Sequence, residues 1–540
     1  MAKSHSTTSG MAAEPGLDMQ EVMNDSKQEM KDMNEQAGSG ASRRGWLARA
    51  VISAVSATAA GLLVACATNE VSKNTELGAK DGVVALRVVK MDWRVLDQFI
   101  VQNLETQQVY RLSPQPTLGG DSLRFMGVLP AGRYQARSLH GQTPQELATV
   151  DVVHTLDVPL TGEQNQFEVQ PAVLTNLGSL VFLPLADKRF IAPRESTPVA
   201  AREWLHYANP ALEGKLQPVQ EKGWLQPPAP RDAELLKQQL VYAESRALPI
   251  GPPLPDAKGA YWNVGKLGTV FELSNGLRYR AGTVQQLTAL ARLADDSLLV
   301  GGEEGYVAVS TPDRRSWRLQ PSPASKAAVA LLATQAPDGT VYLVSRTPNG
   351  VVVHAADTNA VTWNWREVRR LPHGSEGRPP LAVNAGEHIV VYTAGPDTLS
   401  SLDLRTGQWE AHPVQGRVQT LRGWPDGLVL AVGFSRSFEV TADFGRTWQQ
   451  LDQFGNSTLP EFVSPTRGYV AAVPFGSART APTLFKTTDS GKTWTNVGSA
   501  PPGVNSVQGT LVYDRVAQRL GYEVASGKIA WSSDEGKSWQ

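Results

Sequence analysis

Cysteine is almost absent from this sequence, which has one, Cys66, among 540 residues. A single cysteine excludes an intramolecular disulfide and any cysteine cluster for zinc or an iron–sulfur centre. An excess of one charge is also missing, because 51 Lys and Arg face 52 Asp and Glu. That balance gives no reason to expect nucleic-acid binding, which needs a basic face to neutralise phosphates. The position of the cysteine is the first positive signal.

Long hydrophobic runs are scarce as well. The run over residues 50–65 is mostly Ala, Val, Leu and Ser and is shorter than the ~20 residues of a membrane-spanning helix. It follows Arg43 and Arg44, and it ends at Leu63-Val64-Ala65-Cys66. This order resembles the lipobox of bacterial lipoproteins, a family in which the cysteine is acylated and becomes the new N-terminus. The resemblance implies that Cys66 carries lipid and that Leu63 and Ala65 belong to the recognition segment; the alternative is an uncleaved anchor with a free thiol.

The basic segment before this run has a second resemblance. Ser42-Arg43-Arg44-Gly45-Trp46-Leu47 resembles the twin-arginine export motif, with Trp46 where that family usually has Phe. The alternative is an ordinary secretory signal that contains two arginines. Ala67 follows the cysteine in place of the Asp that commonly retains lipoproteins at the inner membrane. We therefore expect a protein that folds before export and is anchored by lipid, at the outer membrane facing the periplasm.

The expected organisation has six parts. Residues 1–41 are polar and acidic and are predicted to be a disordered extension, unless the start codon is misassigned. Residues 42–66 form the signal, and residues 67–82 a tether. Alternating apolar runs over 83–185, with a Pro130-Ala131-Gly132 turn, resemble small β-sandwich modules of the transthyretin or collagen-binding B type. Residues 186–256, with two short helical stretches and many prolines, are predicted to be a connector.

From residue 257 to 540 the chain repeats itself. Tryptophans recur at a spacing near 45 residues, a period that is typical of propeller blades. Three repeats carry the pattern Ser/Thr-x-Asp-x-Gly-x-Ser/Thr-Trp, which resembles the Asp-box, or BNR repeat, of sialidase-like propellers. The residues that match are Thr441, Asp443, Gly445 and Trp448; Thr487, Asp489, Gly491 and Trp494; and Ser532, Asp534, Gly536 and Trp539.

The resemblance places each box in the hairpin between the third and fourth strands of a blade, where it has a structural role. The last box ends at Gln540, and strands over residues 260–281 could complete the final blade. The predicted fold is therefore all-β: a small β-sandwich followed by a six- or seven-bladed β-propeller, with seven favoured, and a helical, proline-rich connector.

Catalytic patterns are missing from the sequence. There is no His-Glu-x-x-His, Walker loop or Gly-x-Ser-x-Gly, and the arginine clamp of sialidases cannot be assigned. Arginines such as Arg378, Arg417 and Arg422 are expected mostly at the surface. Gly301-Gly302-Glu303-Glu304-Gly305 is predicted to be a strand–turn–strand rather than a phosphate loop.

One blade, over Val300–Trp317, looks like those of non-enzymatic propellers related to photosystem assembly factors. We expect no catalytic residue, metal or cofactor, and a scaffold or assembly factor that binds a protein. The alternative is a sialidase-like glycosidase or a glycan-binding lectin.

Overall fold

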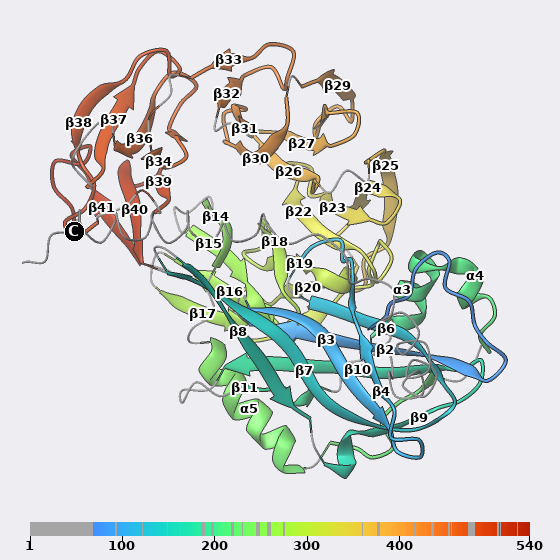
Figure 1. Ribbon diagram of the computed structural model, residues 1–540. Helices are drawn as coiled ribbons and strands as arrows, with labels where there is room; N and C mark the ends of the chain where they lie inside the picture. Colours follow the sequence, from blue (N-terminus) through green and yellow to red (C-terminus); the bar gives the residue numbers. More distant parts are fainter. Residues whose placement is uncertain are drawn as a thin grey trace, which may run out of the picture. The chain divides into compact units, whose positions relative to one another are not determined.

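The computed structural model of the chain describes residues 68–540 with short gaps, and β-strands dominate it (Figure 1). The gaps are residues 92–93, 121, 148–149, 161, 185–189, 196–198, 218–220, 229, 245–248, 256–260, 274–275, 359, 375–377, 415, 434–436, 452–453, 455, 474–480, 505–506, 508 and 526–527. The helices described are short: α3 (Ala201–Ala208), α4 (Pro210–Glu213) and α5 (Pro230–Glu244). The predicted all-β class is confirmed. None of the helices in the described part is long and apolar enough to cross a membrane.

The first strands build two sheets with an apolar core between them. One sheet, called the outer sheet, has the order β1-β4-β3-β7-β8, and β9 also pairs with β7. Its strands are β1 (Thr68–Asn69), β3 (Val95–Asn103), β4 (Val109–Leu112), β7 (Gly132–Leu147), β8 (Val150–Pro159) and β9 (Gln166–Val169). Phe99, Tyr134 and Phe167 of this sheet pack against Phe125 and Phe182 of the other. The arrangement is that of a β-sandwich.

The second sheet, called the inner sheet, has the order β11-β10-β2-β6-β5, and β12 and β13 pair with β10. Its strands are β2 (Asp81–Lys90), β5 (Pro114–Gln115), β6 (Ser122–Pro130), β10 (Leu174–Pro184), β11 (Phe190–Ile191), β12 (Arg194–Glu195) and β13 (Glu221–Lys222). Strand β2 is buried without interruption from Gly82 to Val89. Such a run indicates a strand that is covered on both faces.

The second face of the inner sheet is covered by helices and by the propeller. Trp204 and Leu205 of α3 pack on Val83 and Ala85, in a cluster that also includes Ala327 of the propeller. A neighbouring cluster joins strands β2 and β10 to α5 and to two further propeller residues, Leu267 and Val284. The sandwich therefore shares apolar cores with the propeller.

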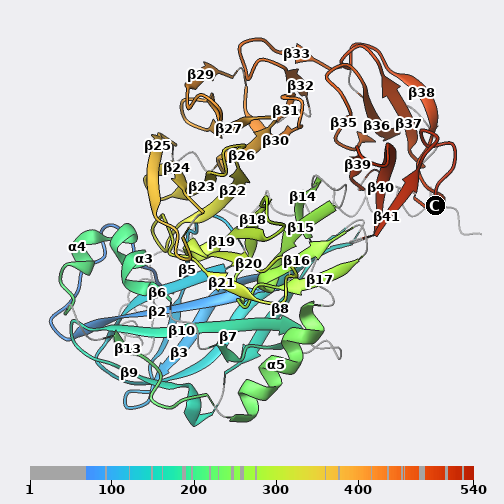
Figure 2. The same cartoon turned by 180° about the vertical axis from the view of Figure 1, so that it is seen from behind.

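Seven sheets follow in the described residues, and we number them as blades 1 to 7 (Figure 2). Blades 1 to 3 are β14–β17 (Pro249–Pro255, Tyr261–Gly265, Thr269–Glu272, Leu277–Arg280), β18–β21 (Leu287–Arg292, Leu298–Gly302, Val307–Ser310, Trp317–Leu319) and β22–β25 (Val329–Gln335, Val341–Thr347, Gly350–Ala356, Trp365–Leu371). Blades 4 and 5 are β26–β29 (Leu381–Ala385, His388–Thr393, Thr398–Asp403, Trp409–Pro413) and β30–β33 (Val418–Gly423, Val429–Gly433, Phe438–Thr441, Gln449–Gln450). Blades 6 and 7 are β34–β38 (Asn456–Ser457, Glu461–Phe462, Gly468–Val473, Thr483–Thr487, Thr495–Ser499) and β39–β41 (Leu511–Asp514, Arg519–Ala525, Lys528–Ser532).

Residues 260–281 were expected to complete the last blade, but their strands belong to blade 1. Strands β15 to β17, over residues 261–280, pair with one another and with β14, and they form blade 1. Blade 7 has three strands in the described residues, and it meets blade 1 by side-chain packing rather than by a shared strand. Tyr261, Phe271 and Leu273 of blade 1 cluster with Val512, and Trp531 packs against Tyr261.

A buried charged contact also joins the sandwich to the propeller. Glu303 and Glu304 lie in the short turn η3 (Glu303–Gly305) between β19 and β20, where the sequence predicts a turn. The Glu304 carboxylate accepts hydrogen bonds from Arg124 Nη2 at 2.6 Å and from Trp204 Nε1 at 2.9 Å. The Ser122 side chain donates to Glu303. Both glutamates are buried, so this contact is part of the interior.

Candidate functional site

The three Asp-box segments form the same hydrogen-bonded turn, which follows β32 in blade 5, β37 in blade 6 and β41 in blade 7. In blade 5 the Thr441 hydroxyl donates to Asp443 Oδ1 at 2.7 Å and accepts from the Gly445 N–H at 2.9 Å. Asp443 also accepts from the N–H and the hydroxyl of Thr447, at 2.8 and 2.6 Å. The same donors and acceptors recur around Asp489 and Asp534. These carboxylates hold their own turns.

Each box presses its glycine against the preceding blade. Gly445, Gly491 and Gly536 have φ of 101°, 88° and 87°, in the region that favours glycine. A Cβ on Gly536 would meet Leu484 of blade 6 at 2.3 Å. The tryptophans of the boxes, Trp448, Trp494 and Trp539, lie against core clusters shared with the preceding blade.

The residue before each box glycine also has a positive φ. It is Phe444 in blade 5, Ser490 in blade 6 and Glu535 in blade 7. Its identity differs between blades, because the turn itself does not use the side chain. The side chain at this position therefore differs in chemical type from one junction between blades to the next. The repeat pattern itself does not indicate a function for it.

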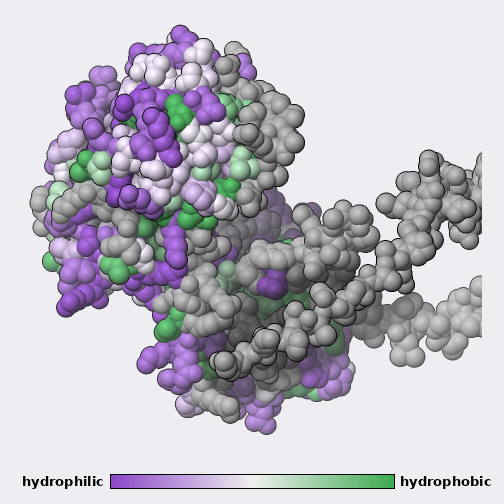
Figure 3. All heavy atoms as spheres, turned by 90° about the vertical axis from the view of Figure 1, so that its left-hand side faces the viewer, coloured by the Kyte–Doolittle hydropathy of each residue, from purple (hydrophilic) through white to green (hydrophobic). Residues whose placement is uncertain are grey.

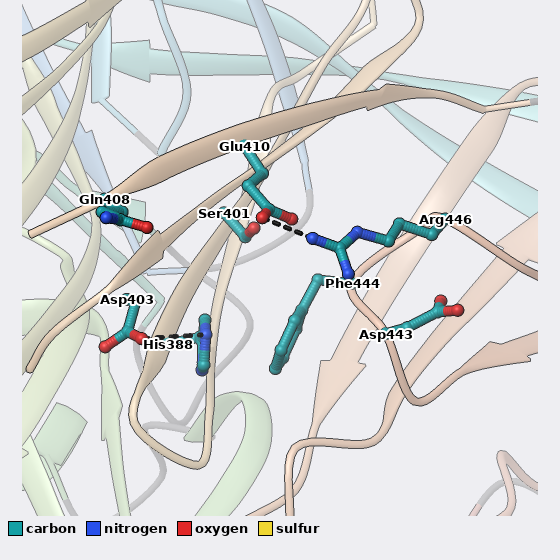
Figure 4. Close-up of a pocket in the computed structure, with 8 residues that line it drawn as sticks. All are labelled: His388, Ser401, Asp403, Gln408, Glu410, Asp443, Phe444 and Arg446. Carbon is teal, nitrogen blue, oxygen red and sulfur yellow. Dashed lines mark hydrogen bonds and ion pairs between the residues drawn. The ribbon is translucent and has the colours of Figure 1, made fainter. Parts of the chain in front are cut away.

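Between blades 4 and 5 this arrangement leaves a pocket of about 210 Å³ (Figure 4). One wall is a single face of three neighbouring strands of blade 4. Because successive side chains on a strand point to opposite faces, alternate residues meet there. The other wall is the blade 5 turn. The lining residues are His388, Ser401, Asp403, Gln408 and Glu410 from blade 4, and Asp443, Phe444 and Arg446 from blade 5.

The two walls touch through a ring stack and an ion pair. The His388 and Phe444 rings lie 3.8 Å apart between centroids, at an angle of 22°. Above them Arg446 Nη2 contacts Glu410 Oε1 at 2.5 Å, as the dashed line in Figure 4 shows. Both partners of this pair are about half exposed, so it contributes only about 0–1 kcal/mol. The pocket therefore lies between the stacked rings of His388 and Phe444 on one side and the weak ion pair of Arg446 with Glu410 on the other.

The ionised forms of two carboxylates in the pocket, those of Asp403 and Asp443, are favoured by hydrogen bonds. Asp403 accepts from the backbone N–H groups of Arg405 and Thr406, at 2.8 and 3.2 Å. Burial raises the pKa of Asp403, but these hydrogen bonds outweigh it and the net pKa is lowered. Burial likewise raises the pKa of Asp443, and the hydrogen bonds from Thr447 and Thr441 lower it overall. Neither group is suited to act as a general acid near neutral pH.

Burial favours the neutral form of the histidine in the pocket. Burial lowers the pKa of His388 below its ordinary value, although the Asp403 carboxylate, 4.0 Å from Nε2, opposes this shift. Glycoside hydrolysis by a carboxylate pair needs one acid with a raised pKa beside an ionised partner. Neither Asp403 nor Asp443 has a raised pKa. Within the residues that the structure describes, no group of three or more His, Cys, Asp or Glu is placed to hold a metal ion.

The carboxyl group with a raised pKa lies elsewhere. Burial raises the pKa of Glu461, and its neighbour Arg422 opposes the shift. Glu461 and Arg422 are 5% and 7% exposed and form an ion pair between blades 6 and 5. Arg422 is therefore an exception to the expectation that most of these arginines lie at the surface. Arg378 also has a partner, Asp397, whose Oδ1 lies 2.8 Å from its Nη1.

The predicted lipidation and export residues, Cys66, Arg43, Arg44, Leu63 and Ala65, lie outside the described residues. The pocket was not predicted from the sequence. A weak signal for it was the large aromatic Phe444 inside an otherwise polar turn.

Comparison with known proteins gives structural matches only. No family model and no curated protein sequence matches the chain. Solved structures similar to part of the chain include the β-propeller domain of Cps50 (Swd1) from Myceliophteria thermophila, with 15% identity and a TM-score of 0.37 over 53% of this chain and 98% of that one. YCF48 from Cyanidioschyzon merolae has 13% identity and a TM-score of 0.38 over 51% and 92% of the two chains. An ulvan lyase of a polysaccharide lyase family has 13% identity and a TM-score of 0.35 over 54% and 95%. At these identities and TM-scores, the matches do not assign the activity or the partner of any of these proteins to this chain.

Proposed function

We propose that this protein is a lipid-anchored envelope scaffold whose propeller binds a protein partner at the pocket between blades 4 and 5. The observation that carries the proposal is that the pocket is a built recess with no assignable acid or nucleophile. Asp403 and Asp443 are fixed by their own turns, and Glu410 is paired with Arg446. Such a recess can recognise a ligand without transforming it.

The surface supports recognition by a small, defined pocket. On the face shown in Figure 3, hydrophobic residues lie in small separate patches among hydrophilic ones. The large exposed apolar residues in the described part, such as Val95, Leu319, Val361 and Val516, are scattered along the chain. Broad apolar patches are what mark large permanent interfaces. A peptide or loop that inserts one side chain fits this surface better.

The anchor is proposed from the lipobox resemblance. Acylation of Cys66 with two or three chains would hold the protein firmly, because each buried methylene contributes about 0.8 kcal/mol. Export in a folded state, through Arg43 and Arg44, suits a chain whose sandwich and propeller share cores. Metabolic labelling with an alkyne fatty acid tests the anchor: the full chain incorporates label and Cys66→Ser does not. Labelling of the Cys66→Ser chain contradicts the lipobox.

A second candidate is a glycan-binding lectin or glycosidase, and one observation favours it. The Phe444 ring in a polar recess is the kind of platform on which a sugar can stack. Incubation of the full chain with sialosides and other glycosides tests turnover. Product formation that disappears in Glu410→Gln would replace the scaffold proposal with an enzyme.

The scaffold is tested by comparative affinity capture from membranes. Phe444→Ser removes the aromatic group and introduces the residue type that blade 6 has at the equivalent position, Ser490, where φ is also positive, so the turn is expected to fold. Val516→Ser, which removes an exposed apolar side chain from blade 7, is the matched control. We expect a protein that is retained by the wild type and by Val516→Ser and lost with Phe444→Ser. Equal capture by all three chains would contradict a role for the pocket.

A further inference from the structure

We infer that the pocket between blades 4 and 5 holds a basic side chain, a lysine or an arginine, of the protein partner. The inference rests on the proposed function, because it names the group that the scaffold would recognise. Three features of the pocket carry it: its charge, its hydrogen-bonding groups, and the way the same junction is filled elsewhere in the propeller.

The lining has an excess of negative charge. It contains three carboxylates, those of Asp403, Glu410 and Asp443, against one guanidinium, that of Arg446. The neutral form of His388 is favoured, since burial lowers its pKa. A cation that enters this recess is attracted by the surplus charge, whereas an anion is repelled.

Hydrogen-bonding groups gather on the wall from blade 4. Ser401 is 3% exposed and lines the pocket beside two of its carboxylates. It lies two residues from Asp403 on β28, and opposite Glu410 of β29, so the three groups share one face. Figure 4 shows the Ser401 hydroxyl and the Glu410 carboxylate on the same side of the pocket. Together they offer acceptors for an ammonium or guanidinium donor.

The junction between blades 6 and 7 shows the chain's own version of this contact. There the residue before the box glycine is Glu535, and Lys486 Nζ of blade 6 lies 2.6 Å from its carboxylate. The hydroxyl of Tyr469 donates to the same oxygen at 2.9 Å. A lysine, an acid and an aromatic ring thus meet within one chain. Between blades 4 and 5 the acids and the aromatic ring are present, and no lysine lines the pocket.

The dimensions favour a side chain over an oligosaccharide. About 210 Å³ is below the roughly 300–1,000 Å³ of ordinary small-molecule sites. One face of Phe444 is already covered by His388. The alkyl stem of a lysine or arginine can lie against the remaining apolar surface while its charged end reaches Asp403, Ser401 and Glu410.

Ligand-observed saturation-transfer NMR on the full chain tests the inference. The probes are Nα-acetyl-arginine amide and Nα-acetyl-lysine amide, with Nα-acetyl-citrulline amide as the neutral analogue of arginine and methyl glycosides as the competing class. We expect the cationic probes to bind the wild type and citrulline to bind at least about tenfold more weakly, since citrulline lacks the charge that strengthens a hydrogen bond to a carboxylate. Equal binding of arginine and citrulline, or no binding of either cationic probe, overturns the inference.

Variants locate the binding. Asp403→Asn with Glu410→Gln removes two charges and keeps an acceptor at each position, and it should weaken the cationic probes about tenfold or more. Glu387→Gln is the matched control, because Glu387 pairs with Arg405 outside the pocket lining. Binding that survives the double variant overturns the assignment. Binding of a glycoside that is lost in Phe444→Ser would favour the glycan class and also overturn it.

The two levels of the proposal fail in different ways. If a partner is captured through Phe444 but neither cationic probe binds, the scaffold stands and the basic side chain is wrong. If the cationic probes bind through Asp403 and Glu410 but capture gives no pocket-dependent protein, the ligand class stands and the scaffold is wrong.

Discussion

Replacing Glu304 by Gln tests whether the buried charged contact holds the sandwich to the propeller. Glu304 is 8% exposed and Arg124 is 7% exposed, so the guanidinium loses its counter-charge in a place that water does not reach. Removing one member of a buried pair typically costs about 3–5 kcal/mol. Glutamine keeps an acceptor for Trp204 Nε1, so the lower end, about 3 kcal/mol, is expected. Glutamine has the same size as glutamate, so the substitution does not change the bulk of the side chain at this position, where φ is 56°.

The assay is differential scanning calorimetry of the full chain. For a cooperative unit of 150–250 residues, about 3 kcal/mol corresponds to a fall of roughly 6–12 °C in Tm. The double variant Glu304→Gln with Arg124→Met removes the uncompensated charge and should recover most of that loss. A Tm that does not move in Glu304→Gln would refute the reasoning. So would a double variant that is as unstable as the single one.

Three further predictions concern the repeats and the anchor. Gly536→Ala should destabilise the chain by more than about 1 kcal/mol, and by more than Gly339→Ala, because both glycines have positive φ but only Gly536 also faces Leu484; urea unfolding compares them. Hydrogen bonds from Ser538 lower the pKa of Asp534 to about 2 from an ordinary 3.8, so the stabilising effect of this carboxylate is present above about pH 4 and is lost as the pH falls toward 2. Asp534→Asn should therefore make Tm less dependent on pH in that range. An unchanged slope of Tm against pH would contradict the lowered pKa. Cys66→Ser should leave the Tm of the folded part unchanged while fractionation moves the protein away from membranes.

The sequence was sufficient for the fold class because each blade repeats its signals locally. The boxes around Asp443, Asp489 and Asp534 lie within a few residues of the strands that they connect, and their hydrogen bonds are all short-range. The turn at Glu303–Gly305 was also predicted. Its partners were not, because Arg124 is 180 residues away and no local pattern connects the two.

The start of the propeller was misjudged because of proline. Residues 249–255 contain four prolines and were assigned to the connector, yet they form β14 of blade 1. Proline lacks an N–H and is confined to edge strands. Strand β14 is the first strand of its sheet and pairs only with β15, so its other edge needs no donors. The proline-rich sequence is therefore compatible with an edge strand, but only the pairing of β14 with β15 shows that it forms one.

The pocket was beyond sequence reasoning for a different reason. Its walls come from alternate residues of three strands and from the turn of the next blade, so its composition depends on pairing register and on how two blades meet. A shift of one residue in any of these strands would turn the polar groups to the opposite face.

The inner sheet has a consequence for the timing of synthesis. Its second face is covered partly by propeller residues, and Arg124 finds its acceptor 180 residues later in the chain. At ~5–20 residues per second, a ribosome needs roughly 9–36 s to cover that distance. Until the end of that interval, the apolar face of the inner sheet lacks its propeller partners and the Arg124 guanidinium lacks its carboxylate. The time in which a chaperone can bind such a face is therefore set by the length of chain still to be synthesised.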